Sequence, residues 1–261
     1  MDRARMLKRT VKKALDSIGI EIRRKTDRLS LDIPPELARV WERCRPFTMT
    51  SLERMAALYD AVRYLEANHI EGDFVECGVW RGGSSMNMAL TLLDCGARER
   101  HLYLFDTFAG MSEPTANDVD IHGRVAQGKF DKLANGPVNG WCFASLEEVT
   151  SNLTGTGYPP DHLHFVQGKV EDTIPARAPD RIALLRLDTD WYESTRHELV
   201  HLFPRLVPGG ILILDDYGHW QGARQAADEY FAEHSIKPLL TRIDYTGRMM
   251  LNVKAPNGSL G

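Results

Sequence analysis

Short runs of hydrophobic residues alternate with helix-length stretches along most of the chain. From Asp73 onward these runs have the length of strands, and they occupy residues 73–79, 101–108, 162–168, 181–190, 209–218, 237–243 and 248–253. Strands separated by helices predict a parallel sheet with helices on both of its faces. Only the turn at 244–247 separates the last two runs, so we expect them to form an antiparallel hairpin. The pattern therefore predicts an α/β fold with a doubly wound, mostly parallel sheet.

Two stretches before this sheet show helical periodicity. Within residues 1–25, apolar side chains recur at helical spacing between lysines and arginines. This basic amphipathic helix is expected to pack on the body or on a second subunit of a homodimer, and the alternative is a position on an anionic lipid surface. A second amphipathic stretch covers residues 51–69, with Thr50 or Ser51 as its N-cap. We assign residues 1–70 to an N-terminal helical segment and residues 71–261 to the main domain.

The segment from about 110 to 140 has no clear period. It is rich in Gly, Asn, Asp and Pro, and it follows the second predicted strand. Loops of this length that lack secondary structure are usually functional or disordered. We therefore predict a lid over the functional site here.

Composition limits the classes of protein to which the chain can belong. Its 261 residues are 43% hydrophobic and 26% charged, which is typical of a globular protein with a substantial core. A formal net charge of -4 does not attract the whole molecule to nucleic acid. No apolar run is long enough for a signal peptide or a membrane span. The four cysteines are scattered and predict reduced thiols in a cytoplasmic protein.

The first motif with chemical meaning is the run from Glu76 to Ser85, at the end of the first strand and the start of a helix. Glycines such as Gly78 let a ligand approach the backbone, and the helix start with Ser84 and Ser85 favours polar or anionic groups. Glu76 is suited to accept a hydrogen bond from an amino acid ammonium group, as in S-adenosylmethionine. The run does not match G-x-G-x-x-G, which disfavours a nicotinamide oxidoreductase. The alternative is a tight turn without a ligand.

Two further pieces follow the next strands. Asp106 ends the second strand, where an acidic side chain can hold ribose hydroxyls, or can instead cap a turn. The run 167–172 follows the third strand, and its Gly168, Val170 and Glu171 are expected to surround the adenine. These pieces stand in order at successive strand ends, so together they predict a nucleoside-bearing cofactor.

Acidic residues at the ends of the fourth and fifth strands give the strongest signal. Asp188 and Asp190 follow one buried strand, and Asp215 and Asp216 follow the next. Parallel strands bring their carboxyl ends to one edge, where clustered carboxylates resist ionisation unless a cation compensates them. Oxygen ligands without His or Cys favour magnesium, manganese or calcium over zinc. The alternative, capping of the two following helices, does not readily explain paired acids at both strand ends.

Several neighbouring residues are secondary candidates. His219 follows the second acid pair, and His122 lies in the predicted lid, so either is a possible general base. Trp191, Tyr192 and Trp220 flank the acids and are expected either to form a wall of the substrate pocket or to pack between helix and sheet.

At these residues the chain resembles the macrocin O-methyltransferase family, which methylates hydroxyls on sugars of antibiotics and related glycosides. The resemblance covers most of the chain. It rests on five motifs, which are Phe47–Ser51, Glu76–Gly83, Leu104–Phe108, Leu187–Tyr192 and Leu214–Gly218. It implies the Rossmann-like class I methyltransferase fold, S-adenosylmethionine and bound magnesium. It also implies that Asp188, Asp215 and Asp216 are the metal ligands, with Asp188 near the cofactor as well, and that Met49 and Ser51 lie near the methionine end of the cofactor.

These inferences combine into one mechanism. We expect direct transfer of the methyl group to a sugar hydroxyl that a divalent cation orients and acidifies. Asp190 is the first candidate for the base because it shares a strand end with a ligand, and His219 is the second. The acceptor is expected to be an antibiotic sugar or a methylated mannose oligosaccharide, selected by the lid. The alternatives are a metal-dependent catechol or phenol O-methyltransferase and a non-catalytic S-adenosylmethionine-binding regulatory protein.

Overall fold

A seven-stranded sheet is the framework of the protein, whose computed structural model describes residues 32–253. The strand order is β5-β2-β1-β6-β7-β9-β8. The strands are β1 (Asp73–Cys77), β2 (Leu102–Asp106), β5 (Leu163–Gln167), β6 (Ile182–Leu187), β7 (Leu206–Leu214), β8 (Thr241–Arg242) and β9 (Arg248–Leu251). The first five strands in this order are parallel, and β9 is antiparallel to both β7 and β8. The predicted doubly wound sheet and its terminal hairpin are therefore confirmed.

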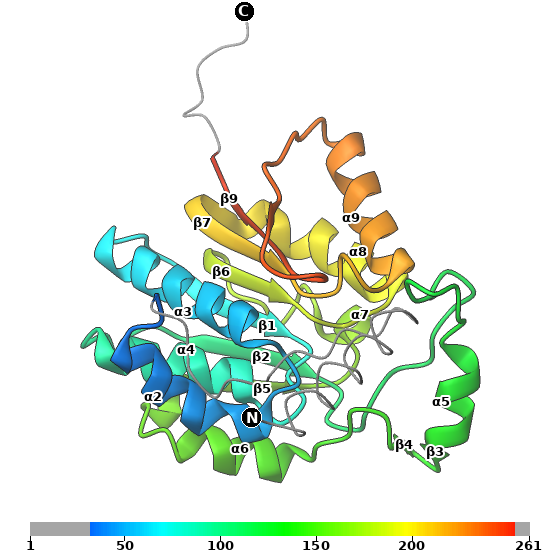
Figure 1. Cartoon of the computed structure of the whole chain (residues 1–261), viewed down its shortest axis with the longest axis horizontal. Helices are drawn as coiled ribbons and strands as arrows, with labels where there is room; N and C mark the ends of the chain where they lie inside the picture. The colour runs from blue at the N-terminus through cyan, green and yellow to red at the C-terminus, as the bar shows by residue number, and fades with distance from the viewer. Residues whose placement is uncertain (1–31, 254–261) are drawn as a thin grey trace, which may run out of the picture. The chain divides into compact units, whose positions relative to one another are not determined.

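Helices cover both faces of this sheet. The α-helices are α2 (Pro35–Cys44), α3 (Leu52–Ala67), α4 (Gly83–Asp94), α5 (Gln127–Leu133), α6 (Leu146–Thr154), α7 (Val170–Thr173), α8 (Tyr192–Leu202) and α9 (Gln221–Glu233). Three short 3-10 helices occupy Arg45–Phe47, Pro160–His162 and Phe203–Arg205. Figure 1 shows α2, α3 and α4 on one side of the sheet and α8 and α9 on the other. The sheet is thus enclosed between two helical layers.

The side-chain alternation of β6 explains how the two layers differ. All six residues of this strand are buried, as expected for the centre of a parallel sheet. Leu185 and Leu187 belong to the apolar cluster that includes Leu199 of α8 and Ala227 of α9. Because successive side chains point to opposite faces, Leu184 and Arg186 point toward the α3 layer. A guanidinium group therefore occupies a core position on that face.

Helices α2 and α3 belong to the same compact unit as the sheet. This unit begins at Pro35, earlier than the predicted domain start at 71. The predicted second amphipathic stretch is confirmed as α3, and the backbone N of Arg54 donates to the Oγ of its N-cap Ser51 at 3.1 Å. The expected amphipathic helix within residues 1–25 lies outside the described residues.

The segment at 110–140 is more structured than its sequence indicates. It contains α5 and a small hairpin of β3 (Ala134–Asn135) and β4 (Val138–Asn139). Asp118 is fully buried and accepts hydrogen bonds from the backbone N of Thr115 at 2.6 Å and from that of Tyr192, at the start of α8, at 2.8 Å. The segment is therefore attached to the body instead of forming an irregular loop, which the aperiodic pattern did not reveal.

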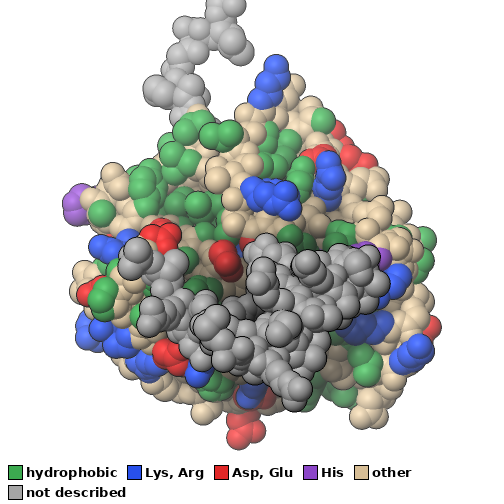
Figure 2. All heavy atoms as spheres, in the orientation of Figure 1, with side chains coloured by type: hydrophobic (Ala, Val, Ile, Leu, Met, Phe, Trp, Pro, Cys, Tyr) green, Lys and Arg blue, Asp and Glu red, His purple; other side chains and the backbone are tan. Residues whose placement is uncertain are grey.

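The surface and the thiols agree with the composition. In the space-filling view, acidic and basic side chains are interspersed over the described surface of this face (Figure 2). All four cysteines are free thiols, and Cys44 and Cys77 are buried. Between residues 32 and 253, no helix is both long and apolar enough to cross a membrane.

Candidate active site

A cavity of about 350 Å³ opens at the carboxyl ends of the five parallel strands. Its lining comes from the ends of β1, β2, β5, β6 and β7, from the segment before α3, and from residues of the 110–140 segment and the β8–β9 turn. Ligands of open α/β sheets bind at this edge. The predicted residues that line the cavity are Met49, Gly78, Ser84, Asp106, Gly168, Val170, Glu171, Asp188, Asp190, Asp215, Asp216 and His219.

The turn after β1 depends on a close backbone crossing. Gly78 has φ +83°, and a Cβ atom at this position would lie 1.9 Å from the carbonyl oxygen of Asp188. An L side chain is therefore excluded by both conformation and space. Gly78 brings the start of α4 directly beside the β6 end that carries the acidic residues.

Asp106 holds two turns of the cavity wall. Its carboxylate accepts hydrogen bonds from the backbone N of Val79 at 2.7 Å, of Trp80 at 3.0 Å and of Phe108 at 2.7 Å. Burial raises the pKa of Asp106, although these three N–H groups favour its charged form. A carboxylate has about four acceptor positions. The fourth has only the Thr107 hydroxyl at 3.4 Å, and that hydroxyl lies closer, at 2.6 Å, to the carbonyl oxygen of Gly110, so a ligand hydroxyl can take this position. The capping and ligand-binding interpretations of Asp106 are therefore compatible.

The segment before α3 packs directly on the start of α4. A Cβ atom on Gly83 would lie 2.6 Å from both the carbonyl oxygen of Phe47 and the Cβ of Thr48. This contact places Met49 at the cavity rim, where its side chain is 60% exposed. At the opposite end, Gly168, Val170 and Glu171 line the cavity where β5 leads into α7. The cavity thus extends across the whole parallel part of the sheet.

The predicted metal ligands do come together. One carboxylate oxygen from each of Asp188, Asp215 and Asp216 lies within 4.8 Å of the other two. Burial raises the pKa of Asp188 and of Asp216, and the neighbouring carboxylates add to the effect. The buried Oδ2 of Asp216 has no hydrogen-bond donor among the described residues. A buried carboxylate oxygen without a donor is costly, so the cluster suits a hard cation.

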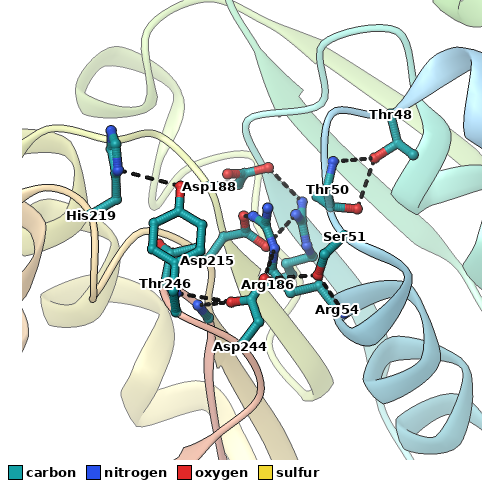
Figure 3. Close-up of polar contacts among 12 residues, drawn as sticks. Thr48, Thr50, Ser51, Arg54, Arg186, Asp188, Asp215, His219, Asp244 and Thr246 are labelled. Carbon is teal, nitrogen blue, oxygen red and sulfur yellow. Dashed lines mark hydrogen bonds and ion pairs between the residues drawn. The ribbon is translucent and has the colours of Figure 1, made fainter. Parts of the chain in front are cut away.

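Two arginines that the sequence reasoning missed already neutralise part of this cluster. Arg186 contacts Glu76 at 2.6 Å, Asp188 at 2.8 Å and Asp215 at 2.5 Å. Arg54 forms ion pairs with Asp215 and, at 3.0 Å, with Asp244. Figure 3 shows both guanidinium groups among these carboxylates. A charged residue inside the apolar run 181–190 was a signal for Arg186, whereas Arg54 resembles any basic residue of an amphipathic helix.

Asp190 sits on a strained turn behind the cluster. It has φ +68°, and burial raises its pKa to about 7, with Asp188 adding to the effect. Its carboxyl group is within hydrogen-bond reach of Asp216 and Trp220. A hydrogen bond fixes this turn to α8, because the Oγ1 of Thr189 donates to Oε1 of the fully buried Glu198 at 3.0 Å. Asp190 is therefore positioned beside the predicted ligands, as expected.

The histidine candidates separate clearly. His219 lines the cavity, its Nδ1 lies 3.4 Å from the hydroxyl of Tyr245, and burial lowers its pKa. His122 is exposed and does not line the cavity. His219 thus remains a candidate base, and the structure does not place His122 at the site.

The aromatic residues divide between wall and packing. Trp191 is 2% exposed and contacts Trp220 edge-on at a centroid distance of 4.9 Å and Trp141 at 5.5 Å. Trp141 and Trp220 line the cavity, whereas Trp191 and Tyr192 do not. The Nζ of Lys129, on α5, lies 3.8 Å from the centroid of the Trp141 ring. The wall therefore combines α5 and Trp141, which the sequence reasoning missed, with Trp220.

Three predicted cofactor contacts lie behind the cavity wall. Glu76 is 1% exposed, and its carboxylate accepts hydrogen bonds from Arg186 and from the Oγ of Ser85. Ser51 donates its Oγ hydrogen to Asp244 at 2.7 Å and caps α3. None of the three lines the cavity. Their polar atoms are used by protein partners, so the structure places them as supports of the site instead of at its surface.

The buried position of Arg186 makes its replacement informative. The variant Arg186→Met leaves Glu76 and Asp215 buried without this partner, and we expect it to destabilise the protein by about 3–5 kcal/mol. Urea unfolding measures this change. The matched control is Arg181→Met, because Arg181 and Glu71 form an exposed pair at 3.1 Å, which contributes at most about 1 kcal/mol. Equal stabilities of the two variants would contradict the central role of Arg186.

Comparisons with known proteins agree on one family. The sequence model described as Macrocin-O-methyltransferase (TylF) matches residues 24–251. The 8-demethyl-8-(2,3-dimethoxy-alpha-L-rhamnosyl)-tetracenomycin-C 4'-O-methyltransferase of Streptomyces olivaceus is 36% identical over 227 residues, which are 87% of this chain and 83% of the relative. The mycinamicin III 3''-O-methyltransferase of Micromonospora griseorubida is 32% identical over 200 residues, 77% of this chain and 76% of the relative.

A solved structure is similar to most of the chain. The O-methyltransferase NovP superposes with a TM-score of 0.70 at 31% sequence identity, over 80% of this chain and 83% of that chain. The range matched by the family model, 24–251, includes every cavity residue described above.

Proposed function

Because the chain belongs to the macrocin O-methyltransferase family, we propose that it methylates a sugar hydroxyl of a glycoside or oligosaccharide, using S-adenosylmethionine and a divalent cation. The protein is an O-methyltransferase. The three aspartates whose oxygens converge within 4.8 Å at the cavity carry the proposal. The Streptomyces relative is a 4'-O-methyltransferase of a rhamnosyl-bearing tetracenomycin, and the Micromonospora relative is a 3''-O-methyltransferase of mycinamicin III. The rhamnosyl group of the first acceptor supports a sugar hydroxyl as the acceptor group.

The cofactor would occupy the half of the cavity formed by strand ends. Ser84 and the Gly78 turn are suited to its amino acid end, with Met49 at the rim. The fourth acceptor position of Asp106, which has only a 3.4 Å contact with Thr107, suits a ribose hydroxyl, and the run 168–171 suits the adenine. Glu76, Ser85 and Ser51 support this half without contacting the cofactor.

The divalent cation would bind at Asp188, Asp215 and Asp216. The donor set is all carboxylate, which magnesium and manganese prefer. The Oδ2 of Asp216, buried without a donor, is the observation that favours a cation here. When bound, S-adenosylmethionine supplies the methyl group and the cation lowers the pKa of the acceptor hydroxyl.

Asp190 would take the proton of the acceptor hydroxyl. It lines the cavity beside Asp216, and its burial raises its pKa, which favours a carboxylate that can accept a proton. Trp220 and Trp141 would form the wall against which the acceptor is held. With cofactor and acceptor aligned, much of the rate should come from positioning.

A panel of acceptors tests the proposed function directly. Purified protein is incubated with S-adenosylmethionine and glycosides, methylated mannose oligosaccharides, catechols or other phenols, with magnesium or with a chelator. Mass spectrometry should detect a gain of one methyl group on a sugar acceptor only when magnesium is present. If only catechols or other phenols are methylated, the acceptor is a phenol and the proposed sugar acceptor is wrong. If turnover in chelator equals turnover with magnesium, the reaction does not require the cation.

Asp216→Asn isolates the role of the cation, because the Oδ2 of Asp216 has no protein donor to lose. We expect this variant to fold normally, to bind S-adenosylhomocysteine as the wild type does, and to bind Mg²⁺ at least about tenfold more weakly. Calorimetry measures both affinities. An unchanged Mg²⁺ affinity would exclude Asp216 as a ligand.

Asp190→Asn tests the base. Loss of the proton acceptor should lower kcat by about 10²–10⁴-fold while both ligand affinities stay close to wild type. The comparison variant is His219→Asn, for which we expect less than about tenfold loss. Steady-state kinetics with the acceptor found in the panel measures kcat for both variants. If kcat falls further in His219→Asn than in Asp190→Asn, His219 and not Asp190 is the base.

A further inference from the structure

Both carboxylate oxygens of Asp215 are already engaged by guanidinium groups. Asp215 is 2% exposed; its Oδ1 accepts from Arg186 at 2.5 Å, and its Oδ2 accepts from Nη1 of Arg54. A cation bound by Asp215 must therefore approach an oxygen that a positive group already contacts. One of the two arginines has to share that oxygen or release it.

The two arginines differ in their freedom to move. Arg186 is 3% exposed and contacts Glu76, Asp188 and Asp215, so its departure would leave buried acids unpaired. Arg54 lines the cavity, its side chain is 13% exposed, and only Nη1 contacts Asp215. Its Nη2 donates no hydrogen bond to any residue of the described chain, 32–253. Arg54 is therefore the arginine that can release Asp215 when a cation binds.

Arg54 also has a second carboxylate to hold it after release. Its Nε donates to Oδ2 of Asp244 at 3.0 Å. Asp244 is fixed in turn, because its Oδ1 accepts from the backbone N of Thr246 at 2.9 Å and of Gly247 at 2.7 Å. At Gly247 a Cβ atom would lie 3.0 Å from the Cδ of Arg54, so this glycine leaves room for the side chain.

We infer that Arg54 competes with the divalent cation for Asp215 and thereby sets the cation affinity of the site. The inference rests on the cation site of the proposed function. Without a cation, Arg54 neutralises Asp215. When a cation binds, like-charge repulsion displaces the guanidinium toward Asp244, which keeps it paired.

Two substitutions with opposite expected effects test the competition. Arg54→Gln removes the competing charge, so the Kd for Mn²⁺ should fall by about tenfold. Asp244→Asn removes the carboxylate that receives Arg54, so the Kd should rise several-fold. Free Mn²⁺ is followed by electron paramagnetic resonance during titration of each full-length protein, and circular dichroism melting verifies that each variant is folded.

Two further variants act as controls. Arg54→Lys keeps a positive charge beside Asp215, so its Kd should stay much closer to that of the wild type than the Kd of Arg54→Gln does. Arg39→Gln removes an arginine that pairs with Asp94 at 2.9 Å on the surface, and its Kd should equal that of the wild type. Together they separate the local charge of Arg54 from helix packing and from net charge.

Each outcome decides the inference. An unchanged or raised Kd for Mn²⁺ in Arg54→Gln overturns the inference. If Arg54→Gln does not fold, an unchanged or lowered Kd in Asp244→Asn overturns it. If the wild type binds Mn²⁺ and Arg54→Gln binds it with the same Kd, the cation site is supported and only the competition is wrong. If neither the wild type nor Arg54→Gln binds Mn²⁺ at millimolar concentration, the cation site and the competition both fail.

Discussion

The guanidinium of Arg186 is the interaction on which the rest of the site depends. In the sheet register, Arg186 of β6 lies beside Glu76 of β1 on one side and Ile213 of β7 on the other. Its ion pairs with Glu76 and Asp215 therefore join three adjacent strands on one face, just below their carboxyl ends. A buried network of this kind is weak evidence for stability, because desolvation opposes the Coulomb attraction. Its value is geometric, since it fixes the acidic residues relative to the turn after β1.

The same network explains why so many acidic residues can gather at one edge. Six carboxyl groups gather here, those of Glu76, Asp188, Asp190, Asp215, Asp216 and Asp244. Within residues 32–253 their ion pairs are with Arg54 and Arg186 alone, and Asp190 and Asp216 have none. Positive charge is therefore scarcer than negative charge at this edge. The pKa values of Asp188, Asp190 and Asp216 are raised, mainly by burial and also by the neighbouring carboxylates. The fold thus places more carboxylates than cations at this edge, and the proposed divalent cation would offset this excess of negative charge.

Sequence patterns predicted the sheet and most of the cavity for a simple physical reason. Parallel strands buried on both faces must be continuous apolar runs, and their carboxyl ends must meet, so Asp188, Asp215 and Asp216 could be placed together without coordinates. Side-chain direction was not accessible in the same way. Glu76 is predicted to contact the cofactor, and in the structure its carboxylate accepts hydrogen bonds from Arg186 and Ser85, which the sequence pattern did not indicate. The helix α5 and the β3–β4 hairpin within the 110–140 segment were also missed, because Asp118 fixes the segment through a long-range backbone contact that leaves no periodic signal.

The two halves of the cavity are built in different ways, and this has a consequence for how acceptors can change. The half assigned to the cofactor is formed by strand ends and by backbone contacts so close that Gly78 admits no Cβ atom. The opposite wall is formed by side chains such as Lys129 and Trp141, which come from the 110–140 segment and the stretch directly after it. Substitutions in that wall alter shape and charge without moving any strand, whereas substitutions at the strand ends disturb the carboxylates as well. Under the proposed function, a new acceptor would be accommodated by changing this wall while the carboxylate cluster and the Arg186 network stay intact.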